Sequence, residues 1–104
     1  MNLGLHHLNH INYLFSEALS AAGAALGLSS ELVNTLAAQT AFGAASLQTQ
    51  PGADFVALRT AVTSPNGTTA SAIATFEQNQ ALRHLIEAAA RAAHRRSQEL
   101  SKGV

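Results

Sequence analysis

The chain has 104 residues, the length of one domain, which leaves no room for a second fold of ordinary size. Its six Lys and Arg balance six Asp and Glu, so no charge excess points to nucleic acid or to an anionic membrane. It has no cysteine, no signal-peptide pattern and no apolar run near the roughly 20 residues of a membrane span, so we expect a cytoplasmic protein without thiol chemistry.

The first half of the chain predicts two helices. From residue 9 to about residue 26 apolar residues recur at helical spacing, and Gly27 is typical of the left-handed position just after a helix end. The Ser29-Ser30 pair is suited to cap a second helix, and Glu31 in its first turn complements the helix dipole. This second helix continues until Pro51-Gly52 stops it.

The second half predicts three more helices, at about residues 54–61, 68–77 and 80–101, with a break at Asn79. No segment alternates apolar and polar residues for long enough to form a strand. The sequence therefore predicts an all-α fold, a bundle of about five helices.

The helix lengths and their apolar faces predict a homodimer. The last helix would be about 33 Å long at 1.5 Å per residue, whereas a compact domain of this size has a radius of gyration of about 13 Å. The apolar faces consist mainly of alanine, and each alanine buries little area. We expect such helices to interlace with those of a second copy; the alternative is a loose monomeric bundle whose last helix frays.

The stretch "AVTSPNGTTASA", residues 61–72, places a turn with several hydroxyl groups directly before a helix. Backbone N–H groups at a helix start have no partner inside the helix, and with nearby hydroxyls they suit an anion such as a carboxylate. The candidate residues for this anion site are Ser64, Gly67, Thr68 and Thr69. Plain capping, in which Ser64 or Thr68 satisfies its own helix, is the alternative.

Four segments carry a resemblance to a known family: "LFSEALSAAGAALGL" (14–28), "AAQTAFGAASL" (37–47), "ALRTAVTSPNGTTASAI" (57–73) and "LIEAAARAAHRRSQEL" (85–100). They are similar to the C-terminal dimerisation domain of pyrroline-5-carboxylate reductases. The most specific match is "VTSPNGTT", which corresponds to the family signature V-[TSC]-S-P-G-G-[TA]-T. The resemblance covers residues 13–104 as one such domain and leaves residues 1–12 as a divergent lead-in.

The resemblance implies a substrate-binding role within an oxidoreductase of proline biosynthesis. In the family this turn holds the carboxylate of 1-pyrroline-5-carboxylate, which implies the same for Ser64, Gly67, Thr68 and Thr69 here. The family reduces that substrate to L-proline with NAD(P)H and forms interlaced dimers, some of which assemble into larger rings. We therefore expect a small-molecule ligand, the substrate or proline, and a homodimer or higher oligomer.

The cofactor half of the family pattern is missing from this sequence. It contains no G-x-G-x-x-G after a strand, so we expect no catalytic and no cofactor-binding residues in it. A Rossmann domain, supplied natively or by a separate partner chain, would have to bring NAD(P)H. The choice between NADH and NADPH, and whether Met1 is the natural start, stay open. The competing hypothesis is a stand-alone oligomerisation or regulatory module without catalysis.

The sequence also departs from the family pattern at three places, and it contains one histidine cluster. Asn66 replaces a family glycine, residues 54–56 read Asp-Phe-Val in place of His-Pro-Gly, and residues 6–12 match poorly. His6, His7 and His10 have partial metal-ligand spacing but no completing ligand, so we predict no metal site; a solvated or partner-facing helix start is the simpler explanation.

On the last helix, the spacing predicts two surface ion pairs, Glu87 with Arg91 and Arg95 with Glu99.

Overall fold

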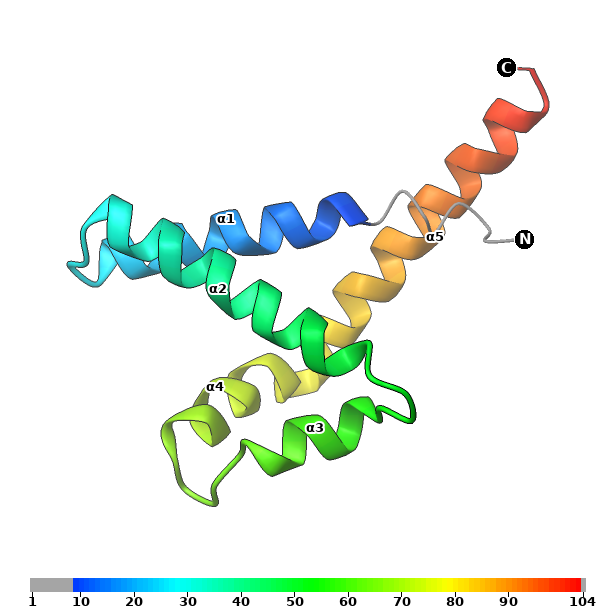
Figure 1. The fold of residues 1–104 in the computed structure, drawn as a ribbon. Coiled ribbons are helices and arrows are strands. Elements are labelled where there is room, and N and C mark those ends of the chain that lie inside the picture. The colour runs from blue at the N-terminus through cyan, green and yellow to red at the C-terminus, as the bar shows by residue number, and fades with distance from the viewer. Residues whose placement is uncertain (1–8, 104) are drawn as a thin grey trace. The chain divides into compact units, whose positions relative to one another are not determined.

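A computed structural model describes residues 9–103 of the chain (Figure 1). These residues form the helices α1 (Asn9–Ala25), α2 (Ser30–Gln48), α3 (Phe55–Ala61), α4 (Thr68–Glu77) and α5 (Ala81–Ser101), with a 3-10 turn, η2 (Gln78–Gln80), before α5. No strand occurs between residues 9 and 103, so the predicted all-α class is confirmed, and the helix ends lie close to those expected. The chain divides into two compact units, with one boundary in the sequence between Arg59 and Thr60.

In the first unit, α1 and α2 form a helical hairpin, whose tight turn follows from local sequence signals (Figure 1). Gly27 adopts φ 101°, and the N–H groups of Gly27 and Leu28 donate to the carbonyls of Ala24 and Gly23 at 3.0 and 3.2 Å. This pair of hydrogen bonds is a Schellman motif, which ends α1 and satisfies its last carbonyls. The hydroxyl of Ser29 then accepts from the N–H of Leu32 at 3.2 Å and caps α2, as predicted.

The hairpin packs through small residues. Val33 and Ala37 on α2 are 5% and 4% exposed and are the buried apolar residues of the described chain. Val33 lies directly against Gly23, where an added Cβ would come within 2.5 Å of Val33 Cγ1. The Ser20 hydroxyl donates to the carbonyl of Val33 at 3.4 Å. The absence of a side chain at Gly23 is therefore what lets α1 and α2 approach so closely.

The large apolar residues of the same hairpin lie on its outside. Tyr13 is 68% exposed, Phe42 is 76% exposed, and Leu14 and Leu19 are exposed as well. The sequence showed apolar residues at helical spacing along α1, but the face that packs on α2 contains Ser20 and Gly23. The periodicity identified a helix correctly without identifying which of its faces packs against α2.

A side-chain cap also begins α3. Asp54 Oδ1 accepts from the N–H of Ala57 at 3.0 Å, which satisfies one free donor of the first turn. The predicted helix start at Asp54 is therefore a cap position, and α3 itself begins at Phe55.

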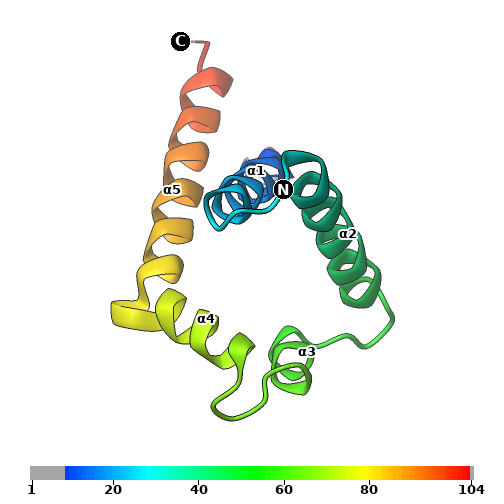
Figure 2. The same ribbon diagram turned by 90° about the vertical axis from the view of Figure 1, so that its left-hand side faces the viewer.

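In the second unit, a sharp corner joins α4 to α5 (Figure 2). Asn79 and Gln80 have φ values of 54° and 56°, two consecutive non-glycine residues in the left-handed region. Asparagine tolerates this region better than most residues, whereas glutamine does not. An ion pair brackets the corner: Arg83 Nε and Nη2 donate to the two carboxylate oxygens of Glu77 at 2.8 and 2.9 Å. The predicted break at Asn79 is thus a two-residue bend.

None of the helices in the described part of the chain is both long and apolar enough to cross a membrane.

Candidate functional site

The candidate site begins with a tight turn between α3 and α4. The N–H of Gly67 donates to the carbonyl of Ser64 at 3.0 Å and closes a four-residue turn. Pro65 occupies the second position, and Asn66 occupies the third with φ 61°. Proline followed by a positive φ is the pattern of a type II turn. Asn66 therefore adopts a positive φ, the backbone region that also suits the glycine of the family signature at this position.

Gly67 joins the turn to the helix. Its carbonyl accepts from the N–H of Ser71 at 3.1 Å, so Gly67 is the N-cap of α4. Its own φ is ordinary, at −87°, so backbone freedom is not the reason for glycine here. The reason is space: an added Cβ would lie 3.2 Å from the Ser64 carbonyl oxygen and 3.3 Å from Ser64 Cβ. The turn is too tight at this point for a larger residue without a shift of Ser64.

The first turn of α4 is left without a side-chain cap. Among the residues that the structure describes, no side chain bonds to its N-terminal N–H groups, in contrast to α2 and α3, which Ser29 and Asp54 cap. Within residues 9–103 no acceptor is found for the N–H groups of Thr68, Thr69 and Ala70. The alternative of plain capping by Ser64 or Thr68 is therefore not what the structure contains.

All four predicted residues lie together at this helix start. Ser64, Thr68 and Thr69 are exposed and Gly67 is half-buried, and the three hydroxyls make no hydrogen bond within the described residues. Sequence analysis missed one donor, the N–H of Ala70, because a side-chain pattern does not reveal backbone groups. Three N–H groups and three hydroxyls at the positive end of a helix dipole can bind a small anion.

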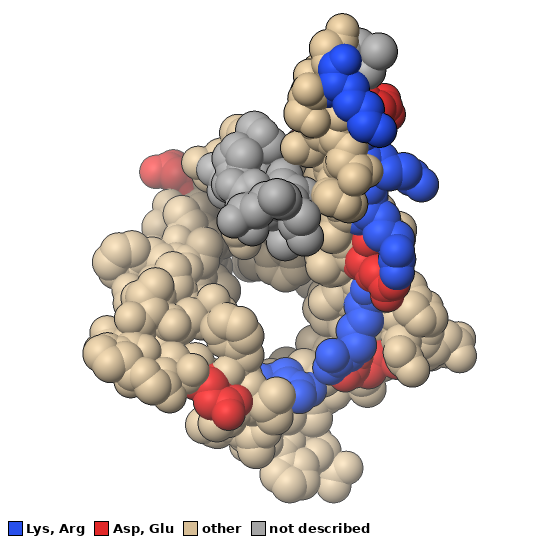
Figure 3. Space-filling model, turned by 90° about the vertical axis from the view of Figure 1, so that its right-hand side faces the viewer, with Lys and Arg blue, Asp and Glu red and all other residues tan. Residues whose placement is uncertain are grey.

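The cationic side chains of the chain are concentrated elsewhere, on α5 (Figure 3). Arg91 Nη2 lies 2.7 Å from Glu87 Oε1, which confirms the predicted pair, and the hydrogen bond with Arg91 lowers the pKa of Glu87. The predicted pair of Arg95 and Glu99 is wrong, because Glu99 lies 3.3 Å from Arg96 instead. A glutamate four residues after its arginine is the less favourable order on a helix.

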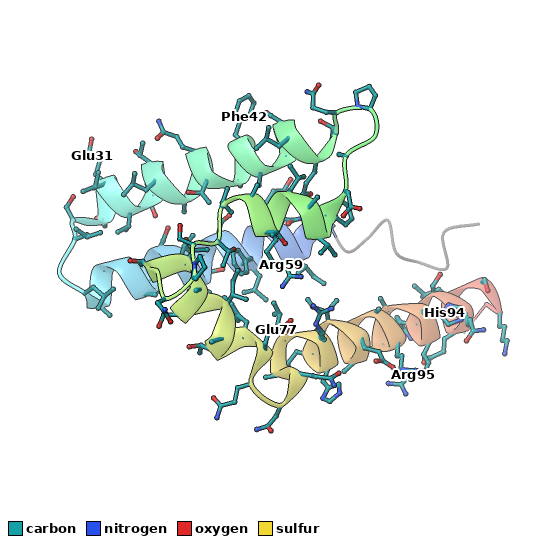
Figure 4. The ribbon with its side chains drawn as sticks, turned by 90° about the horizontal axis from the view of Figure 1, so that it is seen from below. Glu31, Phe42, Arg59, Glu77, His94 and Arg95 are labelled. Atoms are coloured by element: carbon teal, nitrogen blue, oxygen red, sulfur yellow. The ribbon has the colours of Figure 1, made fainter. Side chains whose placement is uncertain are left out.

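The histidines do not add a metal site within the described residues. His6 and His7 lie outside the described residues, while His10 makes an edge-on contact with Tyr13, with ring centroids 5.8 Å apart. No group of three His, Cys, Asp or Glu that could hold a metal is found between residues 9 and 103. His94 lies next to Arg95 in the second half of α5, far from Glu77 at the end of α4 (Figure 4).

Comparison with known proteins identifies the family. The family described as "Pyrroline-5-carboxylate reductase dimerisation" matches residues 11–100. The chain is 43% identical over 90 residues to a pyrroline-5-carboxylate reductase of Pseudomonas aeruginosa, and the match covers 86% of the chain and 33% of that protein. It is 45% identical over 89 residues to one of Glycine max, covering 86% of the chain and 32% of that protein. A relative of Mycobacterium tuberculosis with the same name is 41% identical over 105 residues, with 85% and 35% covered.

These matches define an all-α association domain. The chain belongs to the pyrroline-5-carboxylate reductase dimerisation family. It spans about a third of the length of the curated relatives it matches. The family description indicates self-association of this domain.

Proposed function

We propose that this chain is the substrate-binding and dimerisation domain of a pyrroline-5-carboxylate reductase, a protein that reduces 1-pyrroline-5-carboxylate to L-proline. The observation that carries the substrate-binding role is the open first turn of α4, where Thr68, Thr69 and Ala70 each offer an N–H without an acceptor in the described structure. The names of the relatives supply the substrate, whose carboxylate matches these donors.

The carboxylate is held by charge-assisted hydrogen bonds at the turn. Backbone N–H groups at the start of α4 donate to it, and the exposed hydroxyls of Ser64, Thr68 and Thr69 supply further donors. Each hydrogen bond to a charged group contributes about 1.5–3 kcal/mol, and the helix dipole adds about 0.3–2 kcal/mol. These magnitudes are sufficient for a carboxylate site that uses no Arg or Lys.

The hydride of the reduction comes from NAD(P)H when a dinucleotide-binding domain holds that cofactor. No residue of this chain is assigned to cofactor binding or to catalysis, so the domain does not turn over alone. The Rossmann domain is expected either in the same longer protein or in a partner chain, and the assembly is expected in the cytoplasm. A reductase assay of the purified chain with 1-pyrroline-5-carboxylate and NADPH tests this, and turnover without a second chain would contradict it.

The carboxylate site is tested by titrating the chain with L-proline, the reaction product, while backbone amide shifts are followed by NMR. Saturable shifts confined to residues 64–70 are expected. Thr69→Val, which removes one hydroxyl at nearly constant volume, is expected to weaken binding about tenfold, the loss of one such hydrogen bond. The matched control is Thr40→Val on exposed α2, which should bind as the unsubstituted chain does. Equal binding by both variants, or shifts spread away from the turn, would exclude the site.

We further propose that the domain self-associates as a homodimer or a higher oligomer. The outside of the α1–α2 hairpin supports this, because it exposes Tyr13, Leu14, Leu19 and Phe42 while the hairpin packs through small residues. Burying one large apolar side chain stabilises by about 1.5–3 kcal/mol, so this surface gains much from a second copy. Phe42 projects from α2 without cover in the single chain (Figure 4).

Sedimentation equilibrium tests the dimer. The unsubstituted chain should sediment as a dimer, and Phe42→Ser should shift the equilibrium toward monomer by about tenfold or more. Gln48→Ser, at an exposed polar position of the same helix, is the matched control and should leave the dimer intact. A monomer at all concentrations would contradict the proposal.

The second candidate is a stand-alone oligomerisation or regulatory module. The observation that favours it is the apolar outside of the α1–α2 hairpin, which serves association whether or not a cofactor is held nearby. It predicts that the chain binds proline or pairs with a full-length reductase, but that no added Rossmann domain restores turnover to it. Mixing the chain with an isolated dinucleotide-binding domain and assaying reduction separates the two functions.

A further inference from the structure

We propose that Asn66-Gly67 is a site of spontaneous deamidation, and that the carboxylate it creates weakens anion binding at the start of α4. The second part rests on the proposed carboxylate site, whereas the deamidation itself does not. The site lies where this chain departs from its family signature, because an asparagine occupies a position that the signature fills with glycine.

The reaction requires only water and base. The backbone nitrogen of Gly67 loses its proton to solvent base and attacks Cγ of Asn66, forming a cyclic imide, while the Cγ–Nδ2 bond breaks and ammonia leaves. Water then opens the ring at one of its two carbonyls. Opening at Cγ leaves an aspartate, and opening at the backbone carbonyl leaves an isoaspartate. No electron transfer and no cofactor are involved.

The sequence at this position favours the attack. Gly67 has no side chain to shield its nitrogen, and it gives the backbone the freedom that ring closure needs. Asn66 is exposed, and its side-chain amide makes no hydrogen bond to any of the described residues. The electrophilic carbon is thus open to attack and the leaving ammonia passes directly into solvent.

One hydrogen bond opposes the reaction. The N–H of Gly67 donates to the Ser64 carbonyl at 3.0 Å, so the turn must open before this nitrogen attacks. A single hydrogen bond in an exposed turn slows the reaction by about tenfold. Asn34, in contrast, lies inside α2, where several helical hydrogen bonds must break together before the same chemistry occurs.

The backbone of the turn restricts which residues fit at positions 66 and 67. The positive φ of Asn66 admits asparagine, aspartate or glycine far better than other residues, and the space beside Ser64 admits only glycine at position 67 without a shift. The geometry of the turn therefore favours glycine, asparagine or aspartate at position 66, and this chain has asparagine, which forms a reactive pair with Gly67. Aspartate fits the left-handed backbone of the product, whereas isoaspartate adds a methylene to the main chain and disrupts the turn.

The product places a negative charge two residues before Thr68, beside the open N–H groups of α4. A carboxylate there is favourable for the helix dipole but repels an anionic ligand. Two like charges a few ångströms apart in partly solvated surroundings reduce affinity by about fivefold to tenfold. Deamidation is thus expected to convert an anion-binding turn into one that binds weakly.

The test begins with the intact chain in mildly alkaline buffer, sampled over days and digested for mass spectrometry. The Asn66 peptide should gain one mass unit and contain isoaspartate, at least about tenfold faster than the Asn34 peptide. Asn79, also at positive φ but followed by Gln80, is the internal comparison and should react more slowly because a side chain shields its neighbour's nitrogen. An Asn66 that reacts no faster than Asn79 and Asn34 would overturn the proposal.

The consequence is tested with two variants that both accept the backbone. Asn66→Gly cannot deamidate and should keep the affinity of the fresh chain for L-proline, while Asn66→Asp should bind L-proline about fivefold to tenfold more weakly. If the fresh chain does not bind proline at all, the proposed function fails while the mass-spectrometric result still decides the modification. If Asn66→Asp binds as well as Asn66→Gly, the effect on the anion site is refuted.

Discussion

The contact between Gly23 and Val33 gives the sharpest test of how this chain folds. Replacing Gly23 by alanine places a Cβ within 2.5 Å of Val33 Cγ1 and 3.3 Å of Val33 Cβ. Val33 is only 5% exposed, so it has little room to move away. The substitution therefore has two opposite effects on stability. Alanine is a better helix former than glycine in α1, but its Cβ overpacks the contact with α2.

The sizes of these two effects decide whether Gly23→Ala stabilises or destabilises the chain. Alanine is about 1 kcal/mol better than glycine in a helix interior. Forcing an extra methyl group into a packed contact costs about 1–3 kcal/mol. The matched control is Gly43→Ala in α2, where an added Cβ meets nothing within 4 Å and only the propensity gain remains. Gly43→Ala should thus exceed Gly23→Ala in stability by about 1–3 kcal/mol.

Chemical denaturation followed by circular dichroism measures the two variants, at several protein concentrations so that effects on association separate from effects on the fold. A difference of 1 kcal/mol corresponds to about 4–8 °C in Tm for a domain of this size. Adding Val33→Ala to Gly23→Ala removes Cγ1 and should recover part of the loss, with a coupling of about 0.5–3 kcal/mol. If Gly23→Ala were as stable as Gly43→Ala and showed no coupling to Val33, the close approach of α1 and α2 would be refuted.

Two further predictions concern the second unit. Gln80→Gly should stabilise the chain by up to about 1 kcal/mol, because glycine accepts the φ of 56° at the corner. The control Gln98→Gly, inside α5, should destabilise the chain by about as much. Thermal melts of both variants measure the two changes in stability. The hydrogen bond with Arg91 lowers the pKa of Glu87 in the folded chain, so its contribution to stability is present above the ordinary glutamate pKa and is lost as pH falls through the lowered value. An NMR titration should show the pKa of Glu87 rise in Arg91→Gln, and an unchanged pKa would contradict the pairing.

Local sequence signals predicted most of the fold. Gly27 ends α1 at positive φ, Ser29 caps α2, and α4 spans Thr68–Glu77, each as expected from residues within a few positions. The turn before α4 was equally readable, because Pro65 and an asparagine at positive φ specify it almost alone. These features depend on backbone preferences of neighbouring residues, which a sequence displays directly.

Features that depend on how a bend or a side chain is arranged in space were not predictable in the same way. The pairing of Arg83 with Glu77 across the corner arises only because Asn79 and Gln80 bend the chain, since residues six apart on a continuous helix face different directions. Arg96 rather than Arg95 pairs with Glu99, although the spacing of both allowed a pair. The open N–H groups of α4 likewise follow from the absence of a cap, although Ser64 and Thr68 both stood near enough in sequence to provide one.

The sequence by itself thus determined the all-α class, the helix ends, the turn and the membership of a reductase dimerisation family, because each is encoded in local propensity or in a specific motif. Only the tertiary structure decided which faces pack. Ser20 and Gly23 turn inward against Val33 while Tyr13 and Phe42 stay outside. The physical reason is that helix packing depends on how closely two backbones approach, and small residues permit an approach that larger apolar side chains prevent.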